Sequence, residues 1–494
     1  MSNTQSSFRR CVCFAAMITM MGACAVGPNF VRPTPLHPER YTAEPMPDAT
    51  VAADAKAQRF TSGTALASDW WRLFKSPQLD AVVQKALLNN PTLQASEASL
   101  RQSQDRLRAG YGVFFPKVGA ELNAARQRTA PLEQGLGTAP SVFNVITLSG
   151  TIGYALDIFG GTRRTVEGLK AQVDYQIYAS KAAYLTLSAN VVNTSIARAA
   201  YIAEVRATEQ LIDLQKQQLK STEAAAHAGT VPYSEMLSLR SLIASNQATL
   251  APLEQKISQT VDLLASLEGE VPSKVLLPDI DLSGLSLPVD LPVSLPSDLA
   301  HQRPDILSSE AELHAASADI GVATAAMFPS VSLSASYGGA ASSFGTLSAA
   351  RSRFWSVGPS VTIPVFQGGT LWHGRKAAID AYQAAQAAYR TIVLDAFAQV
   401  ADSLNALEHD ATALQAEVDA KRAAGEALDL LQVEYRAGLV AYLDVWVADV
   451  QFHQATIGYL QAVAQRYQDT VALFVALGGG WWNQPQPATT GTTP

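Results

Sequence analysis

The chain has 494 residues, of which 48% are apolar and 16% are charged, and its formal net charge is −7. The apolar share excludes disorder over most of the chain, because disordered proteins are poor in apolar residues. Charged residues are scarcer than the roughly 25% that is usual in soluble proteins. An acidic balance without a basic run argues against nucleic acid as a partner.

The first residues have the layout of an export signal. Arg9 and Arg10 form a positive n-region, and residues 11–23 form an apolar stretch that is too short to span a bilayer. The stretch ends in Met-Gly-Ala directly before Cys24, which resembles the lipobox of bacterial lipoproteins, whose cysteine is acylated. An ordinary signal peptide that happens to contain a cysteine is the alternative. We expect Cys24 to become the lipid-bearing first residue.

Cleavage before Cys24 would remove the other two cysteines, Cys11 and Cys13. The mature chain would then hold no disulfide and no thiolate metal site, and we expect neither a metal nor another cofactor. Ala25 follows the lipid-bearing residue, where an Asp would be the usual signal for retention in the inner membrane. Anchoring in the outer membrane is therefore favoured, since several acyl chains on one residue suffice for stable attachment.

The rest of the chain is a duplicated unit. Four short blocks recur in the same order at offsets of 208 to 213 residues. The first of the four pairs is Asn90-Pro91-Thr92-Leu93 with Arg303-Pro304-Asp305-Ile306, and the others are Phe115-Pro116 with Phe328-Pro329, Gly160-Gly161-Thr162 with Gly368-Gly369-Thr370, and Ala228-Gly229-Thr230-Val231 with Ala437-Gly438-Leu439-Val440. A repeat of this length indicates gene duplication within one fold rather than a solenoid.

Each half predicts the order helix, strand, loop, strand, very long helix, tight break, long helix. Residues 169–228 and 375–424 contain no Gly or Pro and are rich in helix-forming residues. A 60-residue helix would be on the order of 90 Å long, so neighbouring helices must cover it along its length.

Four segments before these helices have the two-residue period of strands, namely 118–124, 146–158, 331–337 and 355–365. Each has one apolar face and one face of small polar residues that is almost free of Lys, Arg and Glu. This pattern is typical of a transmembrane barrel with lipid outside and water inside. A strand of a soluble sandwich is the alternative.

Four strands cannot close into a barrel, and an open edge in lipid leaves unpaired backbone groups. Single-chain barrels begin at about 8 strands, so we expect the barrel to be shared among chains, with a trimer as the smallest assembly that leaves a pore. The predicted fold class is a mixed α/β membrane protein: a trimeric 12-stranded transmembrane β-barrel, four strands per chain, continued by a long α-helical barrel and built from two repeats.

The expected organisation along the chain is a signal peptide (1–23), a lipidated Pro-rich tether (24–70), a first repeat (71–275), a Pro-rich linker (276–296), a second repeat (297–480) and a flexible tail (481–494).

The sequence resembles the TolC-like outer-membrane factors, and within them the lipoprotein branch. The resemblance covers nearly the whole mature chain. The matching blocks are Cys24–Phe30, Asp69-Trp70-Trp71-Arg72-Leu73-Phe74, Arg303-Pro304-Asp305-Ile306 with Glu310, Ala311, Glu312, Gly321 and Phe328-Pro329, then Ile363–Gly369 and Leu477-Gly478-Gly479-Gly480-Trp481.

The resemblance implies a homotrimer that serves as a passive exit duct through the outer membrane, with its helical tunnel in the periplasm. An inner-membrane pump of the resistance-nodulation-division type would drive export of drugs or small solutes through a periplasmic adaptor. The outer-membrane channel of type I protein secretion, working with an ABC transporter, is the alternative.

The resemblance also implies functional residues. Adaptor contacts would fall on the two tight breaks, Ala228, Gly229, Thr230, Val231 and Ala437, Gly438, Leu439, Val440, which are otherwise simply turns. Relatives narrow the tunnel just after the second break with a Leu, a carboxylate and an Arg. Leu443 matches the first, but Val447 and Val450 stand at the acidic and basic positions. Asp444 and Asp449 lie nearby, and threefold symmetry would make them an acidic ring unless they are ordinary solvated residues.

Two other classes of protein remain. For an enzyme, the sequence offers no catalytic residues that we can assign: it has no Walker loop, His-Glu-x-x-His, Gly-x-Ser-x-Gly or paired-cysteine motif, and its histidines are scattered. A lipoprotein spacer or adhesin without a pore would keep the helices but has no use for period-2 strands at matching places in both repeats.

Overall fold

The computed structural model describes residues 25–34, 38–64, 66–128 and 139–483. Contacts divide the chain into two compact units, and the long helices contribute residues to both. Of the described residues, unit 1 contains those within Met1–Pro33, Leu100–Gln176 and Ser309–Tyr389, and unit 2 contains those within Thr34–Ser99, Ile177–Ser308 and Arg390–Pro494. Within the described ranges, no helix is both long and apolar enough to cross a membrane.

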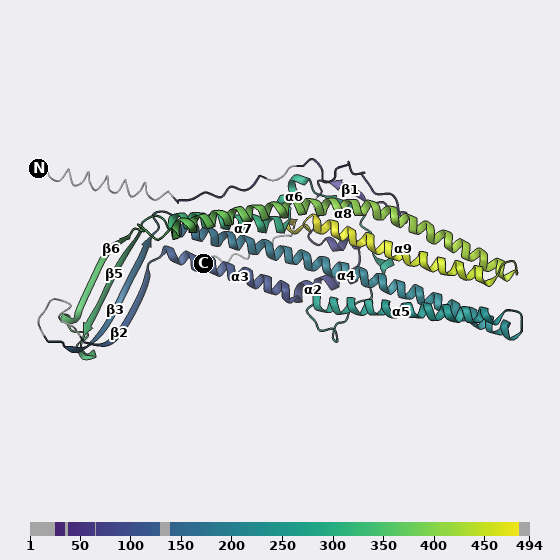
Figure 1. The fold of residues 1–494 in the computed structure, drawn as a ribbon, viewed down its shortest axis with the longest axis horizontal. Coiled ribbons are helices and arrows are strands. Elements are labelled where there is room, and N and C mark those ends of the chain that lie inside the picture. The colour runs from purple at the N-terminus through teal and green to yellow at the C-terminus, as the bar shows by residue number, and fades with distance from the viewer. Residues whose placement is uncertain (1–24, 35–37, 65, 129–138, 484–494) are drawn as a thin grey trace. The chain divides into compact units, whose positions relative to one another are not determined.

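The two halves of the chain have the same order of elements (Figure 1). The first half contains α2 (Pro77–Asn89), α3 (Pro91–Tyr111), β2 (Lys117–Arg128), β3 (Val142–Leu156), α4 (Gly161–His227) and α5 (Tyr233–Leu267). The second half contains α6 (Pro296–Gln302), α7 (Pro304–Ala325), β5 (Ser330–Ala341), β6 (Arg353–Thr362), α8 (Thr370–Arg436) and α9 (Tyr442–Ala476). Helices α4 and α8 have 67 residues each, and α5 and α9 have 35 each. The predicted order of elements is confirmed.

The strand boundaries differ from the predicted ranges by up to four residues at each end, and α8 is longer than its Gly-free segment. Helix α8 continues through Gly374 and Gly425, although glycine is a poor helix former. A Cβ atom at Gly425 would lie 3.2 Å from the ring of Phe452 in α9. The absence of a side chain at Gly425 therefore leaves room for this ring. Strand β6 ends at Thr362 rather than at 365, because Pro364 has no N–H to donate to a ladder.

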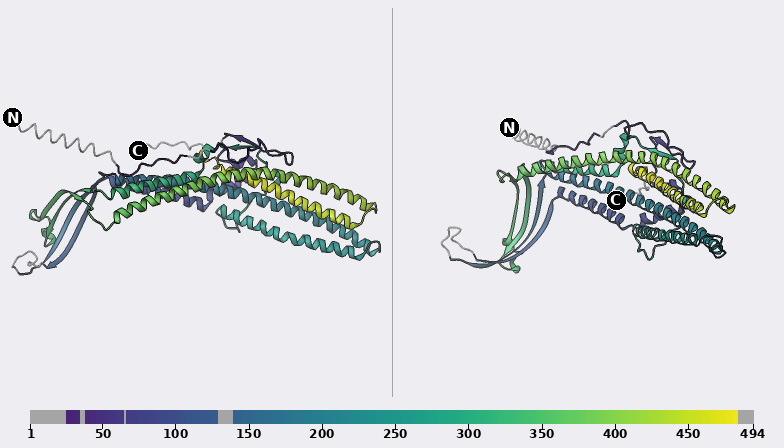
Figure 2. Two further views of the ribbon diagram at one scale, coloured as in Figure 1. Left: turned by 45° about the horizontal axis from the view of Figure 1, so that its top comes forward. Right: turned by 45° about the vertical axis from the view of Figure 1, so that its right-hand side comes forward.

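The sheet of unit 1 has the order β2-β3-β5-β6, and all neighbours are antiparallel (Figures 1 and 2). Its register places most of the large apolar side chains of the four strands on one face, for example Leu122 opposite Leu148 and Tyr337 opposite Trp355. The other face carries hydroxyl side chains, and the Ser336 and Ser356 hydroxyls hydrogen-bond across β5 and β6 at 2.8 Å. The predicted two-faced strands are therefore confirmed.

The first described residues are docked on unit 1. The Val26 N–H donates to the Phe159 carbonyl at 3.0 Å, and the Arg164 guanidinium donates to the Asn29 side chain at 2.7 Å. Gly27 has φ +93°, and a Cβ there would lie 2.5 Å from the Cα of Gly321. Only glycine fits this close backbone approach. The segment that follows Cys24 therefore packs in a defined position within unit 1.

Unit 2 has a small sheet that the sequence did not predict. Strand β1 (Arg59–Ser62) pairs in parallel with β4 (Asp290–Val293), so the N-terminal tether and the Pro-rich linker meet there. Four residues in Pro-rich surroundings carry too little periodicity for such an assignment. Beside the sheet, the 3-10 helix η1 (Trp70–Phe74) buries its aromatic side chains, and Trp70 contacts Phe474 of α9 at a ring distance of 5.7 Å.

The duplication extends to a side-chain contact in unit 2. Asn90, which precedes Pro91 at the α2–α3 junction, donates to the carbonyl of Leu267, the last residue of α5, at 2.9 Å. The equivalent residue in the second half is Arg303, which donates to the carbonyl of Ala476, the last residue of α9, at 2.8 Å. Each pair satisfies a helix C-terminal carbonyl that would otherwise lack a partner.

Arg303 also holds Asp305 through two hydrogen bonds of 3.0 and 2.6 Å. We expect Arg303→Met to lower the free energy of unfolding by about 2–3 kcal/mol, because it leaves the helix-end carbonyl without a partner and removes the arginine from the carboxylate. Denaturant unfolding monitored by circular dichroism measures this loss. Arg422→Met is the control, since the Arg422–Asp419 pair is exposed and should contribute less than about 1 kcal/mol. Equal losses in both variants would contradict the assigned role.

Candidate functional site

Two tight turns close the helical hairpins of unit 2. After α4, the Gly229 N–H donates to the Ala226 carbonyl and the Thr230 N–H to the Ala225 carbonyl, at 3.1 and 3.0 Å. After α8, Gly438 and Leu439 make the corresponding bonds to Tyr435 and Glu434, at 2.9 and 3.0 Å. Gly229 and Gly438 have φ of +76° and +73°, so both turns are Schellman motifs. The eight predicted tip residues lie in these two turns.

Each new helix restarts within a few residues of its turn. Helix α5 follows Pro232, whose fixed φ suits a helix start. At the start of α9, the Asp444 carboxylate accepts a hydrogen bond from the Ala441 N–H at 3.1 Å. This contact satisfies one of the free donors of the helix N-terminus, so Asp444 has a capping role in addition to its predicted one.

Tyr442 joins the two hairpins near the tips. It packs against a buried cluster of α4 and α5 that includes Ile212 and Leu239. It also packs against a cluster of α8 and α9 that includes Leu428, and its ring meets that of Tyr435 edge-on at 5.5 Å. Burial, with the nearby Asp449 carboxylate, raises the pKa of the Tyr442 hydroxyl, so the side chain stays neutral.

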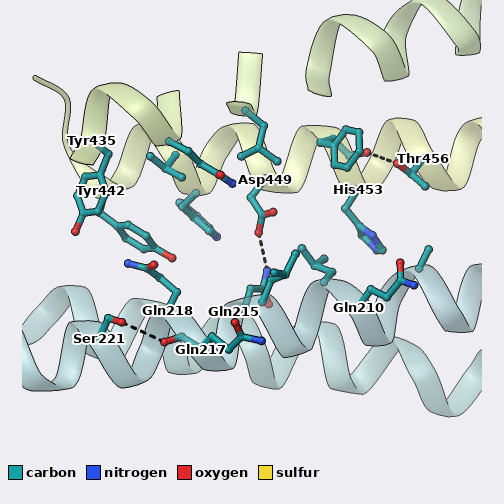
Figure 3. Close-up of a pocket in the computed structure, with 18 of the residues that line it drawn as sticks. Gln210, Gln215, Gln217, Gln218, Ser221, Tyr435, Tyr442, Asp449, His453 and Thr456 are labelled. Atoms are coloured by element: carbon teal, nitrogen blue, oxygen red, sulfur yellow. Dashed lines mark hydrogen bonds between the residues drawn. The ribbon is translucent and has the colours of Figure 1, made fainter. Parts of the chain in front are cut away.

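A cavity lined by both polar and apolar side chains lies between the same helices, just behind the tips (Figure 3). Its volume is about 710 Å³, and α4, α8 and α9 line it. Figure 3 shows the side chains of α4 facing those of α8 and α9 across this space. The side chains that α4 contributes include four glutamines, Gln210, Gln215, Gln217 and Gln218.

Asp449 bridges this cavity. Its carboxylate accepts a hydrogen bond from the Gln215 amide at 3.1 Å, and the Asn246 amide of α5 donates to Gln215 at 3.0 Å. Burial raises the pKa of the Asp449 carboxyl, while the Gln215 hydrogen bond lowers it. The chain of three polar side chains therefore connects α9 to α4 and α5 within one protomer.

The residues predicted to close the tunnel do not share one face of α9. Leu443 is 59% exposed and Val447 is 44% exposed. They lie on one face of α9 with Val450, because residues four and seven apart share a helix face. Asp444 and Asp449 are five residues apart and point in different directions, the first to its own helix start and the second to Gln215. An acidic ring that contains both stays a prediction.

Sequence reasoning missed two residues of this region. Gln215 is one of several glutamines on α4, and nothing in the sequence distinguishes it. Trp446 has a buried indole N–H without a hydrogen-bond partner among the described residues. It lines a second, more apolar groove of about 270 Å³ that lies beside the tips and is also lined by Pro232, Glu235, Leu239, Tyr442 and Leu443.

The remaining site predictions concern lipid and metal. Cys24 lies outside the described residues, so its acylation stays a prediction. The described part of the chain holds no group of three or more His, Cys, Asp or Glu side chains arranged for a metal ion.

The pattern of the outer membrane efflux protein family matches residues 82–270 and 295–479, which are the two halves of the duplication. The chain belongs to this family. It is 31% identical over 450 residues to the pyoverdine export outer membrane protein OpmQ of Pseudomonas aeruginosa, covering 89% of this chain and 94% of that protein. It is 27% identical to the toluene efflux pump outer membrane protein TtgC of Pseudomonas putida, covering 94% of each. The predicted family is confirmed.

A solved structure of the outer-membrane channel OprN has the same fold. It aligns with a TM-score of 0.83 and 26% identity over 93% of this chain and 100% of that one. The Campylobacter jejuni CmeC outer membrane channel aligns with a TM-score of 0.82 at 20% identity, which supports the fold alone. This member of the family therefore has the architecture of the TolC-like channels.

The tip turns give a first test of the site. We expect Gly438→Ala to lower the free energy of unfolding by about 1–2 kcal/mol, because a Cβ is unfavourable in a left-handed conformation. Nothing lies within 4 Å of the added atom, so the loss would report backbone strain alone. Gly374→Ala is the control, since it has equally open space but lies inside α8, and it should stabilise by about 0.5–1 kcal/mol. A neutral Gly438→Ala variant would contradict the assigned turn.

The polar bridge gives a second test. We expect the double variant Asp444→Ala/Asp449→Ala to raise the passive leak of the channel in single-channel recordings. Loss of the bond to Gln215, worth about 1 kcal/mol, would increase the open population about fivefold. Asp419→Ala removes an exposed carboxylate of α8 and should leave the leak unchanged. Equal leak in the double variant and the wild type would exclude both carboxylates from gating.

Proposed function

We propose that this protein is the outer-membrane channel of a tripartite efflux pump, a homotrimer through which small solutes leave the cell passively. Membership of the outer membrane efflux protein family carries the proposal, because its pattern covers both halves of the chain. The channel supplies the exit. A resistance-nodulation-division pump in the inner membrane supplies the driving force, and a periplasmic adaptor joins the two.

The sheet of unit 1 supports the trimer. Strands β2 and β6 are its edges, and each has one side without a partner strand among the described residues. The apolar face is exposed in the single chain, with Val118 78% and Trp355 73% accessible. In lipid, every unpaired backbone group costs several kcal/mol, so the edges must pair with other copies. Three chains give a closed barrel of twelve strands, with the hydroxyl-rich face toward the lumen.

The tips of unit 2 are the proposed site of adaptor contact. Leu439 is 75% exposed at the end of the second hairpin, and the apolar groove beside Trp446 lies within a few residues of it. Exposed apolar side chains around such a groove are typical of a protein interface. The lipid on Cys24 would attach the chain to the outer membrane.

The names of the relatives indicate the class of molecule that is exported. These names concern pyoverdine export, toluene efflux, antibiotic efflux and solvent efflux. All four describe small molecules, which favours solute efflux over polypeptide secretion. Specificity among solutes belongs mainly to the pump, because the duct conducts what the pump delivers.

Crosslinking in native cells, followed by purification through a C-terminal tag, tests this function. We expect trimers together with a periplasmic adaptor and a resistance-nodulation-division pump, and the purified trimer should conduct ions in planar bilayers. Leu439→Arg should abolish recovery of the adaptor, because it places a charge on the exposed apolar tip. Leu276→Arg is the control, since Leu276 is 88% exposed but lies in the linker. Recovery of an ABC transporter would favour secretion, and monomers without conductance would contradict the shared barrel.

A further inference from the structure

Three of the four basic side chains in the four-stranded sheet of unit 1 lie at the same end of that sheet. The four strands carry four Lys or Arg residues, namely Lys117, Arg126, Arg128 and Arg353. The three arginines lie where β2 and β6 join their hairpin loops. The opposite ends of the strands lead into the long helices, as Figure 1 shows for unit 1. In the proposed channel these helices are periplasmic, so the arginines belong to the outer leaflet of the outer membrane.

The strand register places all three arginines on the apolar face. Arg126 and Arg128 alternate in step with Leu122, and their cross-strand neighbours are Asn144 and Val142 of β3. Arg353 lies opposite Gly339, two residues along the strands from the Tyr337–Trp355 pair and on the same face. Since cross-strand partners share a face, these side chains point to the lipid side rather than to the lumen. Aromatic residues such as Tyr337 and Trp355 mark the membrane–water boundary in barrels, so Arg353 lies at that boundary.

The protein offers these arginines no counter-charge in the part that is described. The only carboxylate on the four strands is Glu121, which lies opposite Ser149 on the polar face. No described ion pair involves Arg126, Arg128 or Arg353. All three side chains are exposed. A guanidinium at the membrane boundary costs little to place there, and it is within reach of the anionic groups of lipid headgroups.

The arginines also lie only on the two edge strands. The middle strands β3 and β5 carry no Lys or Arg. Closing three sheets into one barrel brings β6 of one subunit beside β2 of the next, with both hairpin ends on the same side. Each subunit junction would therefore collect Arg126 and Arg128 from one chain with Arg353, and the exposed Arg351 that precedes it, from the other.

We propose that each junction binds the phosphate groups of a phosphorylated glycolipid, of the lipid A type, in the outer leaflet. The inference rests on the proposed trimeric channel. Guanidinium groups bind phosphate oxygens through two parallel hydrogen bonds, and a headgroup with two phosphates matches a cluster contributed by two chains. The bound lipid links neighbouring subunits at the outer rim of the barrel.

Native mass spectrometry of the purified full-length protein with added lipid A tests this site. The wild-type trimer should retain lipid A, and Arg126→Gln/Arg128→Gln/Arg353→Gln should weaken retention about tenfold, because three charged donors are lost. The same glycolipid without its phosphates should bind the wild type as weakly as the variant. Replacing the three arginines by lysine should weaken retention less, since the charge remains. Lys117→Gln, on the polar face at the helix end, is the matched control and should retain lipid A fully.

Equal retention of lipid A by the wild type and the triple glutamine variant, with both trimeric and conducting, would overturn the lipid site and leave the channel intact. Displacement of lipid A by millimolar inorganic phosphate would overturn it in favour of a site for small anions. The same spectra count the chains in each particle. Monomeric wild-type protein would overturn the proposed trimer itself, so the two failures are distinguishable.

Discussion

The backbone hydrogen bonds at the edges of the β2-β3-β5-β6 sheet impose the constraint on which the rest of this protein depends. In the proposed channel the apolar face of this sheet lies in lipid, and lipid offers no partner for the outer sides of β2 and β6. The proposed trimer would satisfy both edges. It would also give the long helices neighbours along their length, which helices such as the 67-residue α4 need to be stable.

The duplication has preserved contacts as well as elements. Asn90 and Arg303 are chemically different, yet each directly precedes a helix-starting proline. Each donates a hydrogen bond to the last carbonyl of the second long helix in its own half. The same hydrogen bond is therefore kept in both halves although the donor side chain differs. At the tips the residue is kept as well: Gly229 and Gly438 are both glycines, because a left-handed turn accepts little else.

The region behind the tips combines a rigid part and a polar part. Tyr442 packs into the cores of both hairpins, whereas Asp449, Gln215 and Asn246 form a hydrogen-bonded chain beside a water-accessible cavity. Hydrogen bonds of this kind contribute modestly and exchange readily with water. The Asp449–Gln215 bond can therefore break without loss of the apolar packing around Tyr442.

The sequence by itself determined the repeat, the order of elements, the two-faced strands, the glycine turns and the family, because periodicity and glycine placement act over a few residues. Only the tertiary structure decided which side chains meet. It paired the short strands β1 and β4 across 231 residues, gave Asp444 a capping role, and turned Asp449 toward Gln215. Such contacts join distant segments whose local patterns carry no signal of each other, so their partners are set by packing rather than by local sequence.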